Sequence, residues 1–78
     1  MKFRQTFGNS ALEARKKPGL TQSQVAEAVS ISVRWYQKIE SGQRLPTFEV
    51  GMSIIIFLGI DPENFRDEVC LNVPVHTL

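Results

Sequence analysis

Cysteine and histidine are scarce in this sequence, with Cys70 and His76 the only residues of their types. One cysteine cannot form an intramolecular disulfide, and there is no Cys/His cluster at the spacing of a zinc site. We therefore expect no metal and no cofactor. Cys70 fits a small buried apolar residue, and its isolation is compatible with a reducing, cytoplasmic location.

Long apolar runs and catalytic motifs are also missing. No run approaches the ~18 residues that a membrane helix needs, and the first ten residues have no apolar signal-peptide core. The GxSxG, Walker and HExxH motifs are absent. These absences predict a protein that is not an enzyme, with no membrane partner and no evident small-molecule ligand.

Charge is low overall but uneven along the chain. The net charge is +1, yet residues 1–44 hold eight Lys or Arg against three Glu, whereas residues 45–78 hold one Arg against five carboxylates. A positive first half and an acidic second half would orient the molecule on a polyanion. With 78 residues the chain predicts one small domain with a marginal core, which a partner surface would help to stabilise.

The residues between 20 and 42 have signals for two short helices around a tight turn. Thr21 and Gln24 form a capping box, after which apolar residues recur at helical spacing and predict a first helix over about 22–28. Ser32 can cap a second helix over about 33–41, and Gly42 can end it.

The second of these helices divides into two faces. Tyr36 and Ile39 lie on one side, and the other side presents Val33, Arg34, Gln37 and Lys38. Arg or Lys can pair with guanine, Gln with adenine, and an aliphatic group can touch the thymine methyl. This division predicts a helix that packs on one face and binds double-stranded DNA with the other.

These residues resemble the Cro/C1-type (XRE-like) helix-turn-helix family. The resemblance covers about residues 11–65 and includes the segments IESGQRLP and LGIDPENF, together with Gln22, Val25, Ala26, Val29, Ile31, Tyr36 and Ile39. It implies an all-α, compact five-helix lambda-repressor-like domain. It also implies a sequence-specific DNA-binding transcriptional regulator, with repression as the expected activity and the helix at 33–41 in the major groove.

The resemblance assigns roles to individual residues. It implies base contacts from Val33, Arg34 and Lys38, with Gln37 nearby, and a phosphate or base contact from Gln22. Ser32 lies at a helix N-terminus, which suits a phosphate, and Arg44 either contacts a phosphate or is an ordinary surface side chain. Arg15 resembles the family's arginine that pairs with Glu40. Two positions depart from the family: Ser30 replaces a turn glycine, and Trp35 replaces a small polar residue.

The flanking segments complete the expected organisation. We expect a loose arm at residues 1–9, a domain at 10–68 whose first helix is capped by Ser10, and a tail at 69–78. A fifth helix is expected to start after Asp61.

The helix expected at about 48–58 is apolar on two sides. We assign Phe48, Met52, Ile55 and Leu58 to the core. Val50, Ile54 and Phe57 form a second stripe, covered either by the tail or by a second copy in a homodimer. This stripe and the acidic half also leave open a different function, a protein-interaction module such as an antitoxin or adaptor.

Overall fold

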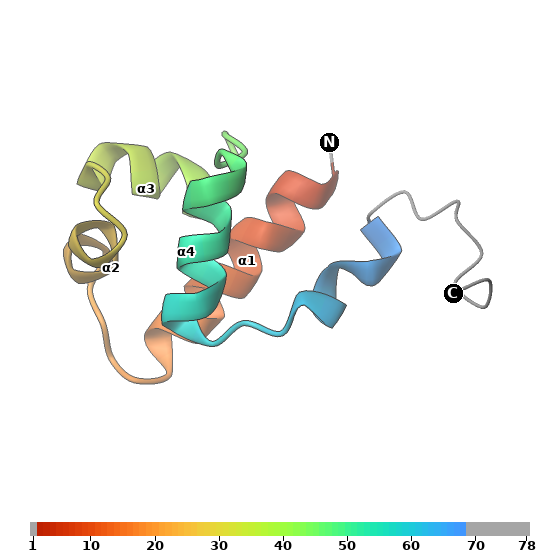
Figure 1. Cartoon of the computed structure of the whole chain (residues 1–78), viewed down its shortest axis with the longest axis horizontal. Helices are drawn as coiled ribbons and strands as arrows, with labels where there is room; N and C mark the ends of the chain where they lie inside the picture. Colours follow the sequence, from red (N-terminus) through yellow and green to blue (C-terminus); the bar gives the residue numbers. More distant parts are fainter. Residues whose placement is uncertain (1, 69–78) are drawn as a thin grey trace.

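The computed structural model describes residues 2–68, which form four α-helices and one 3₁₀ helix (Figure 1). The elements are α1 (Lys2–Lys16), α2 (Gln22–Ala28), α3 (Val33–Glu40), α4 (Phe48–Leu58) and η1 (Pro62–Glu68). Within this part of the chain there is no strand, so the predicted all-α fold is confirmed, although its last element is a 3₁₀ helix. Residue 1 and the tail at 69–78, with its expected packing or dimer contact, lie outside the described residues.

Side-chain caps determine where most helices begin. The Thr21 hydroxyl accepts a hydrogen bond from the Gln24 N–H and the Gln24 side chain accepts one from the Thr21 N–H, so the predicted capping box is present. At α3 and α4 only the hydroxyl takes part: Ser32 accepts from the Trp35 N–H and Thr47 accepts from the Val50 N–H. Each cap satisfies a backbone donor that the first turn leaves without a partner.

The first helix corrects the expectation of a loose N-terminal arm. α1 begins at Lys2, so residues 3–9 are helical and Ser10 lies in mid-helix rather than at its cap. Phe3 and Phe7 pack with Phe65, their ring centroids lying 5.5 and 5.4 Å from that of Phe65. This aromatic packing buries apolar surface and holds the first turns of α1 against η1.

α1 also approaches α3 closely. A Cβ added to Gly8 would lie 2.5 Å from the backbone oxygen of Glu40, closer than real Cβ atoms come. The absence of a side chain at position 8 therefore allows the two backbones to pack directly together. This contact supports α3 from behind at its C-terminal end.

The core lies where α1, α2, α3 and α4 meet. Tyr36, Ile39, Ile54 and Val25 are its largest fully buried side chains. Ile54 belonged to the stripe expected to be covered by the tail or by a second copy, but its side chain is fully buried in the core of the described residues, so it is not available for a dimer contact. Of the same stripe, Val50 is half-buried against the core and Phe57 is exposed.

Two of the four residues in the opposite stripe of α4 were also misassigned, whereas Ile55 and Leu58 pack against the core as expected. Phe48 is 86 % exposed and Met52 39 % exposed, whereas both were expected in the core. The helix instead turns its Gly51 and Ile54 side inward, with Ile55 and Leu58 half-buried beside it. Both stripes are apolar, so hydrophobicity alone did not distinguish the buried one.

The turn between α2 and α3 contains Ser30, at the position where the family usually has a glycine. Ser30 has φ of 62°, the left-handed region that favours glycine.

No helix in the described part of the chain combines the length and apolar character that a bilayer span demands.

Candidate nucleic-acid interface

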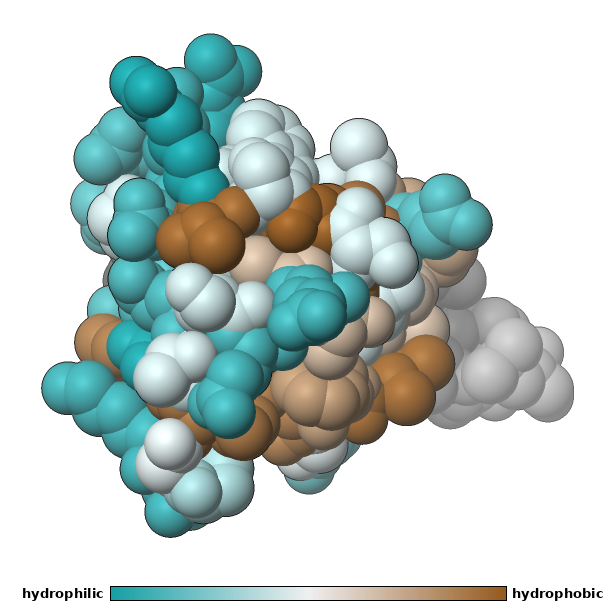
Figure 2. Space-filling view, turned by 90° about the vertical axis from the view of Figure 1, so that its left-hand side faces the viewer, coloured by the Kyte–Doolittle hydropathy of each residue, from teal (hydrophilic) through white to brown (hydrophobic). Residues whose placement is uncertain are grey.

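The outer face of α3, defined by Val33, Arg34, Gln37 and Lys38, is directed away from the core. Val33, Arg34 and Gln37 are exposed and Lys38 is half-buried. Tyr36 and Ile39, on the other side of the same helix, are fully buried. Seen from the α2 and α3 side, the molecule shows hydrophilic side chains over much of its surface with small apolar patches between them (Figure 2).

An open hollow of about 420 Å³ lies on this side of the protein. It brings Gln22 of α2 together with three residues of the outer face, and it is completed by Ser41 and Gln43. Sequence reasoning missed these last two positions. The sequence signal that could have indicated them is a polar loop directly after the predicted recognition helix. The Gln43 N–H donates to the Lys38 carbonyl at 2.9 Å, and this hydrogen bond holds the loop against α3.

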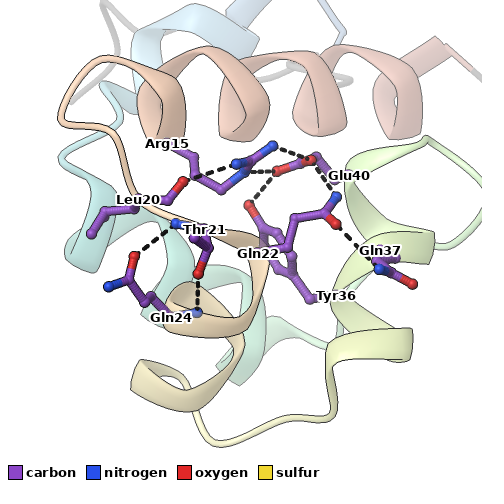
Figure 3. A network of polar contacts seen from close by, with 8 residues as sticks. All are labelled: Arg15, Leu20, Thr21, Gln22, Gln24, Tyr36, Gln37 and Glu40. Atoms are coloured by element: carbon purple, nitrogen blue, oxygen red, sulfur yellow. Dashed lines mark hydrogen bonds and ion pairs between the residues drawn. The ribbon is translucent and has the colours of Figure 1, made fainter.

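Behind the outer face, Arg15 of α1 pairs with Glu40 of α3 (Figure 3). The Arg15 Nε donates to Glu40 Oε2 at 2.7 Å and its Nη2 donates to Glu40 Oε1 at 3.0 Å, a bidentate arrangement. Its Nη1 donates to the Leu20 carbonyl at 2.9 Å. One guanidinium therefore joins α1, the start of the helix-turn-helix and the end of α3.

Two further donors reach the same carboxylate. The Tyr36 hydroxyl donates to Glu40 Oε2 at 2.8 Å, and Gln22 Nε2 donates to Oε1 at 2.8 Å. Burial by itself raises the pKa of Glu40, but the hydrogen bonds from Arg15, Gln22 and Tyr36 outweigh it and hold the pKa below its ordinary value. Burial, followed by the hydrogen bond to Glu40, raises the pKa of the Tyr36 hydroxyl.

The ionised carboxylate also sets the direction of a hydrogen bond on the protein surface. Glu40 can only accept, so Gln22 turns its NH₂ group inward and its oxygen outward. That oxygen accepts from Gln37 Nε2 at 3.2 Å. The Gln37 oxygen and its second N–H then remain available, the acceptor and donor pair that matches the major-groove edge of adenine.

The remaining candidate contacts lie at the two ends of α3. The Ser32 hydroxyl accepts from the Trp35 N–H at 3.0 Å and keeps its own proton for an acceptor such as a phosphate. Arg44 is exposed in the loop after α3, outside the hollow. Trp35 is half-buried and packs against the core.

This architecture and these residues define a helix-turn-helix protein. The helix-turn-helix family profile matches residues 12–65, and the chain belongs to this family, in its Cro/C1-type branch. The chain is similar to the uncharacterized HTH-type transcriptional regulator YqaF of Bacillus subtilis (strain 168). The two are 39 % identical over 56 residues, which cover 72 % of this chain and 74 % of the relative. No solved structure matches the chain.

Proposed function

We propose that this protein is a sequence-specific DNA-binding transcriptional regulator that inserts the outer face of α3 into the major groove. The observation that supports this most directly is the division of α3. Tyr36 and Ile39 are fully buried, which fixes the helix on the body, while Arg34 and Gln37 point into solvent. A helix held in this way presents base-reading side chains at little entropic cost.

Binding would proceed from charge attraction to base contact. Arg34, Lys38 and Arg44 give loose, salt-sensitive attraction to any duplex through release of counterions. Arg34 and Lys38 then donate to guanine O6 and N7, Gln37 pairs with adenine, and Val33 touches a thymine methyl. Gln22 and Ser32 lie where phosphate contacts would fix the register of the helix.

Selection of bound sequences from a random duplex pool tests this function directly. We expect one enriched motif, and Arg34→Ala is expected to cost roughly 1–3 kcal/mol on that motif and to relax preference at one base pair. Arg66→Ala, an exposed arginine of η1, is the matched control and should bind as the parent does. Unchanged affinity in Arg34→Ala would mean that this face does not read DNA.

We further propose that the protein acts as a homodimer on two half-sites and represses by occupying its operator. The exposed end of α4 supports a contact there, since Ile56 is 73 % and Phe57 47 % exposed. Two copies would engage half-sites ~34 Å apart on a near-palindromic operator. Sedimentation at increasing concentration should show a dimer that Phe57→Glu dissociates, and a strict monomer of the parent protein would reject this contact.

The second candidate is a protein-interaction module on the same fold, such as an antitoxin or adaptor. The observation that favours it is the exposed apolar surface of α4, where Phe48 is the most exposed large apolar side chain among the described residues. A gel shift with genomic fragments distinguishes the two functions. Failure to bind any duplex at moderate salt would favour the interaction module.

A further inference from the structure

An apolar groove lies between the N-terminal halves of α1 and α4. Phe3 lines it from α1, Phe48, Met52 and Ile55 line it from α4, and Leu45 closes it from the preceding loop. Its volume is about 350 Å³, and no charged side chain lines it. In Figure 1 the first turns of α1 and α4, which supply Phe3 and Phe48, both lie in the upper part of the view.

The groove is uncovered in the described part of the chain. Phe48, Leu45 and Met52 are all exposed although they are apolar and contiguous along its edge. Contiguous apolar surface of this kind is rarely left in water, because covering it removes apolar area from contact with water. Its occupant should therefore be apolar and uncharged.

The chain leaves η1 close to this groove. The ring of Phe65 packs edge-on against Phe3, with centroids 5.5 Å apart and planes at 80°, and Phe3 is itself part of the groove wall. η1 ends three residues later, at Glu68. An extended chain advances about 3.3 Å per residue, so a few residues beyond Glu68 span the distance past Phe3.

The sequence that follows has the composition that the groove requires. Residues 69–78, VCLNVPVHTL, contain no Asp, Glu, Lys or Arg. Val69, Leu71, Val73 and Val75 alternate with Cys70, Asn72, Pro74 and His76. In an extended segment this alternation places four aliphatic side chains on one side.

We propose that residues 69–78 fold back as an extended segment and occupy the α1–α4 groove of their own chain. Leu71 and Val73 pack against Phe48 and Met52, and Asn72 faces solvent. The tether favours this arrangement over a second copy, because a short link gives the segment an effective concentration in the millimolar range. The site is separate from the outer face of α3, so the proposal does not depend on DNA binding.

The single cysteine allows a direct test with the full chain. A nitroxide attached to Cys70 should broaden the methyl NMR signals of Met52 and Ile55, while the Val33 methyls on the outer face of α3 stay sharp. Mixing spin-labelled protein with isotope-labelled, unmodified protein should abolish the broadening, because the contact lies within one chain. Sharp Met52 and Ile55 signals in the labelled protein would overturn the proposal. Broadening that persists in the mixture would overturn it too, because the occupant would then be a second copy.

A pair of neighbouring variants provides a test without the label. Leu71→Asp should lower the melting temperature and increase binding of a dye that reports exposed apolar surface, because it forces the segment out of the groove. Asn72→Asp adds the same charge on the opposite side and should change neither readout. Equal behaviour of the two variants would refute the proposed packing.

Discussion

At the scale of single residues, Glu40 is the junction of the candidate site. Its side chain is buried, and it accepts hydrogen bonds from α1 through Arg15, from α2 through Gln22 and from α3 through Tyr36. A buried charge of this kind is tolerated only when it is fully paired. Removing the charge should therefore loosen three helices together.

Glu40→Gln tests this role, because it keeps the shape and removes the charge. The carboxyl has a lower pKa in the folded protein than its ordinary value of 4.5, so its stabilisation is fully present above pH 4.5 and is lost as pH falls through the folded-state pKa. We expect the variant to lose about 3 kcal/mol of unfolding free energy at pH 7, with the difference from the parent shrinking below pH 4.5. Urea denaturation across pH measures this, and a difference independent of pH would contradict it.

A substitution of Gln22 tests whether the buried Glu40 carboxylate influences base preference by orienting the Gln37 amide through Gln22. Gln22→Leu removes Gln22 Oε1, which accepts a hydrogen bond from Gln37 Nε2 at 3.2 Å and so orients the Gln37 amide. We expect this variant to weaken base preference at one position of the bound sequence, while preference persists at the position that we propose Arg34 reads. The measurement is selection from a random duplex pool.

The control is a double-mutant comparison with Gln37→Leu. If Gln22 acts through Gln37, the double variant should lose no more preference than Gln37→Leu alone. Additive losses would mean that the two glutamines contact DNA independently.

At the scale of elements, the close packing of α1 on α3 determines how α3 is supported. Gly8→Ala should destabilise the protein by about 1–3 kcal/mol despite its gain in helix propensity, because the new Cβ meets the backbone of Glu40. Gly51→Ala is the matched control: its Cβ would make an ordinary contact with Pro46 at 3.4 Å, so it should be neutral or stabilising by up to about 1 kcal/mol. Thermal unfolding measures both, and equal effects would rule out a tight contact at Gly8.

The sequence predicted some elements better than others for physical reasons. α2 and α4 have local caps, at Thr21 and Thr47, and their predicted bounds agree with the structure. The start of α1 depends instead on Phe65, which lies far along the chain, so local signals placed the first helix too late. The buried side of α4 depends on how the helix meets its neighbours, and two apolar stripes on one helix do not indicate which of them is buried.

In the candidate site, too, the features that depend on contacts between separate helices could not be predicted from the sequence. The buried and exposed sides of α3 followed from helical periodicity, and the pairing of Arg15 with Glu40 was implied by resemblance to the family. The orientation of the Gln22 and Gln37 amides was not predictable, since it depends on a chain of side-chain contacts between separate helices.

At the scale of the whole molecule, the uneven charge should govern approach to DNA. The positive half includes α3 and Arg44, and the acidic half includes α4 and η1. Arg44→Gln should weaken binding about equally on all sequences and reduce the slope of log affinity against log salt by about 1. Arg66→Gln, in the acidic half, is the control and should leave the slope unchanged. A loss confined to one sequence would assign Arg44 to a base instead of a phosphate.

Because α3 has one buried side and one exposed side, the exposed positions can vary in sequence without disturbing the fold. Val33, Arg34 and Gln37 are exposed, and none belongs to the buried core. Mutations at these three positions are therefore largely free of any folding penalty. The scaffold could be retargeted by exchanging a few codons, both during divergence of gene copies and in the construction of orthogonal genetic circuits.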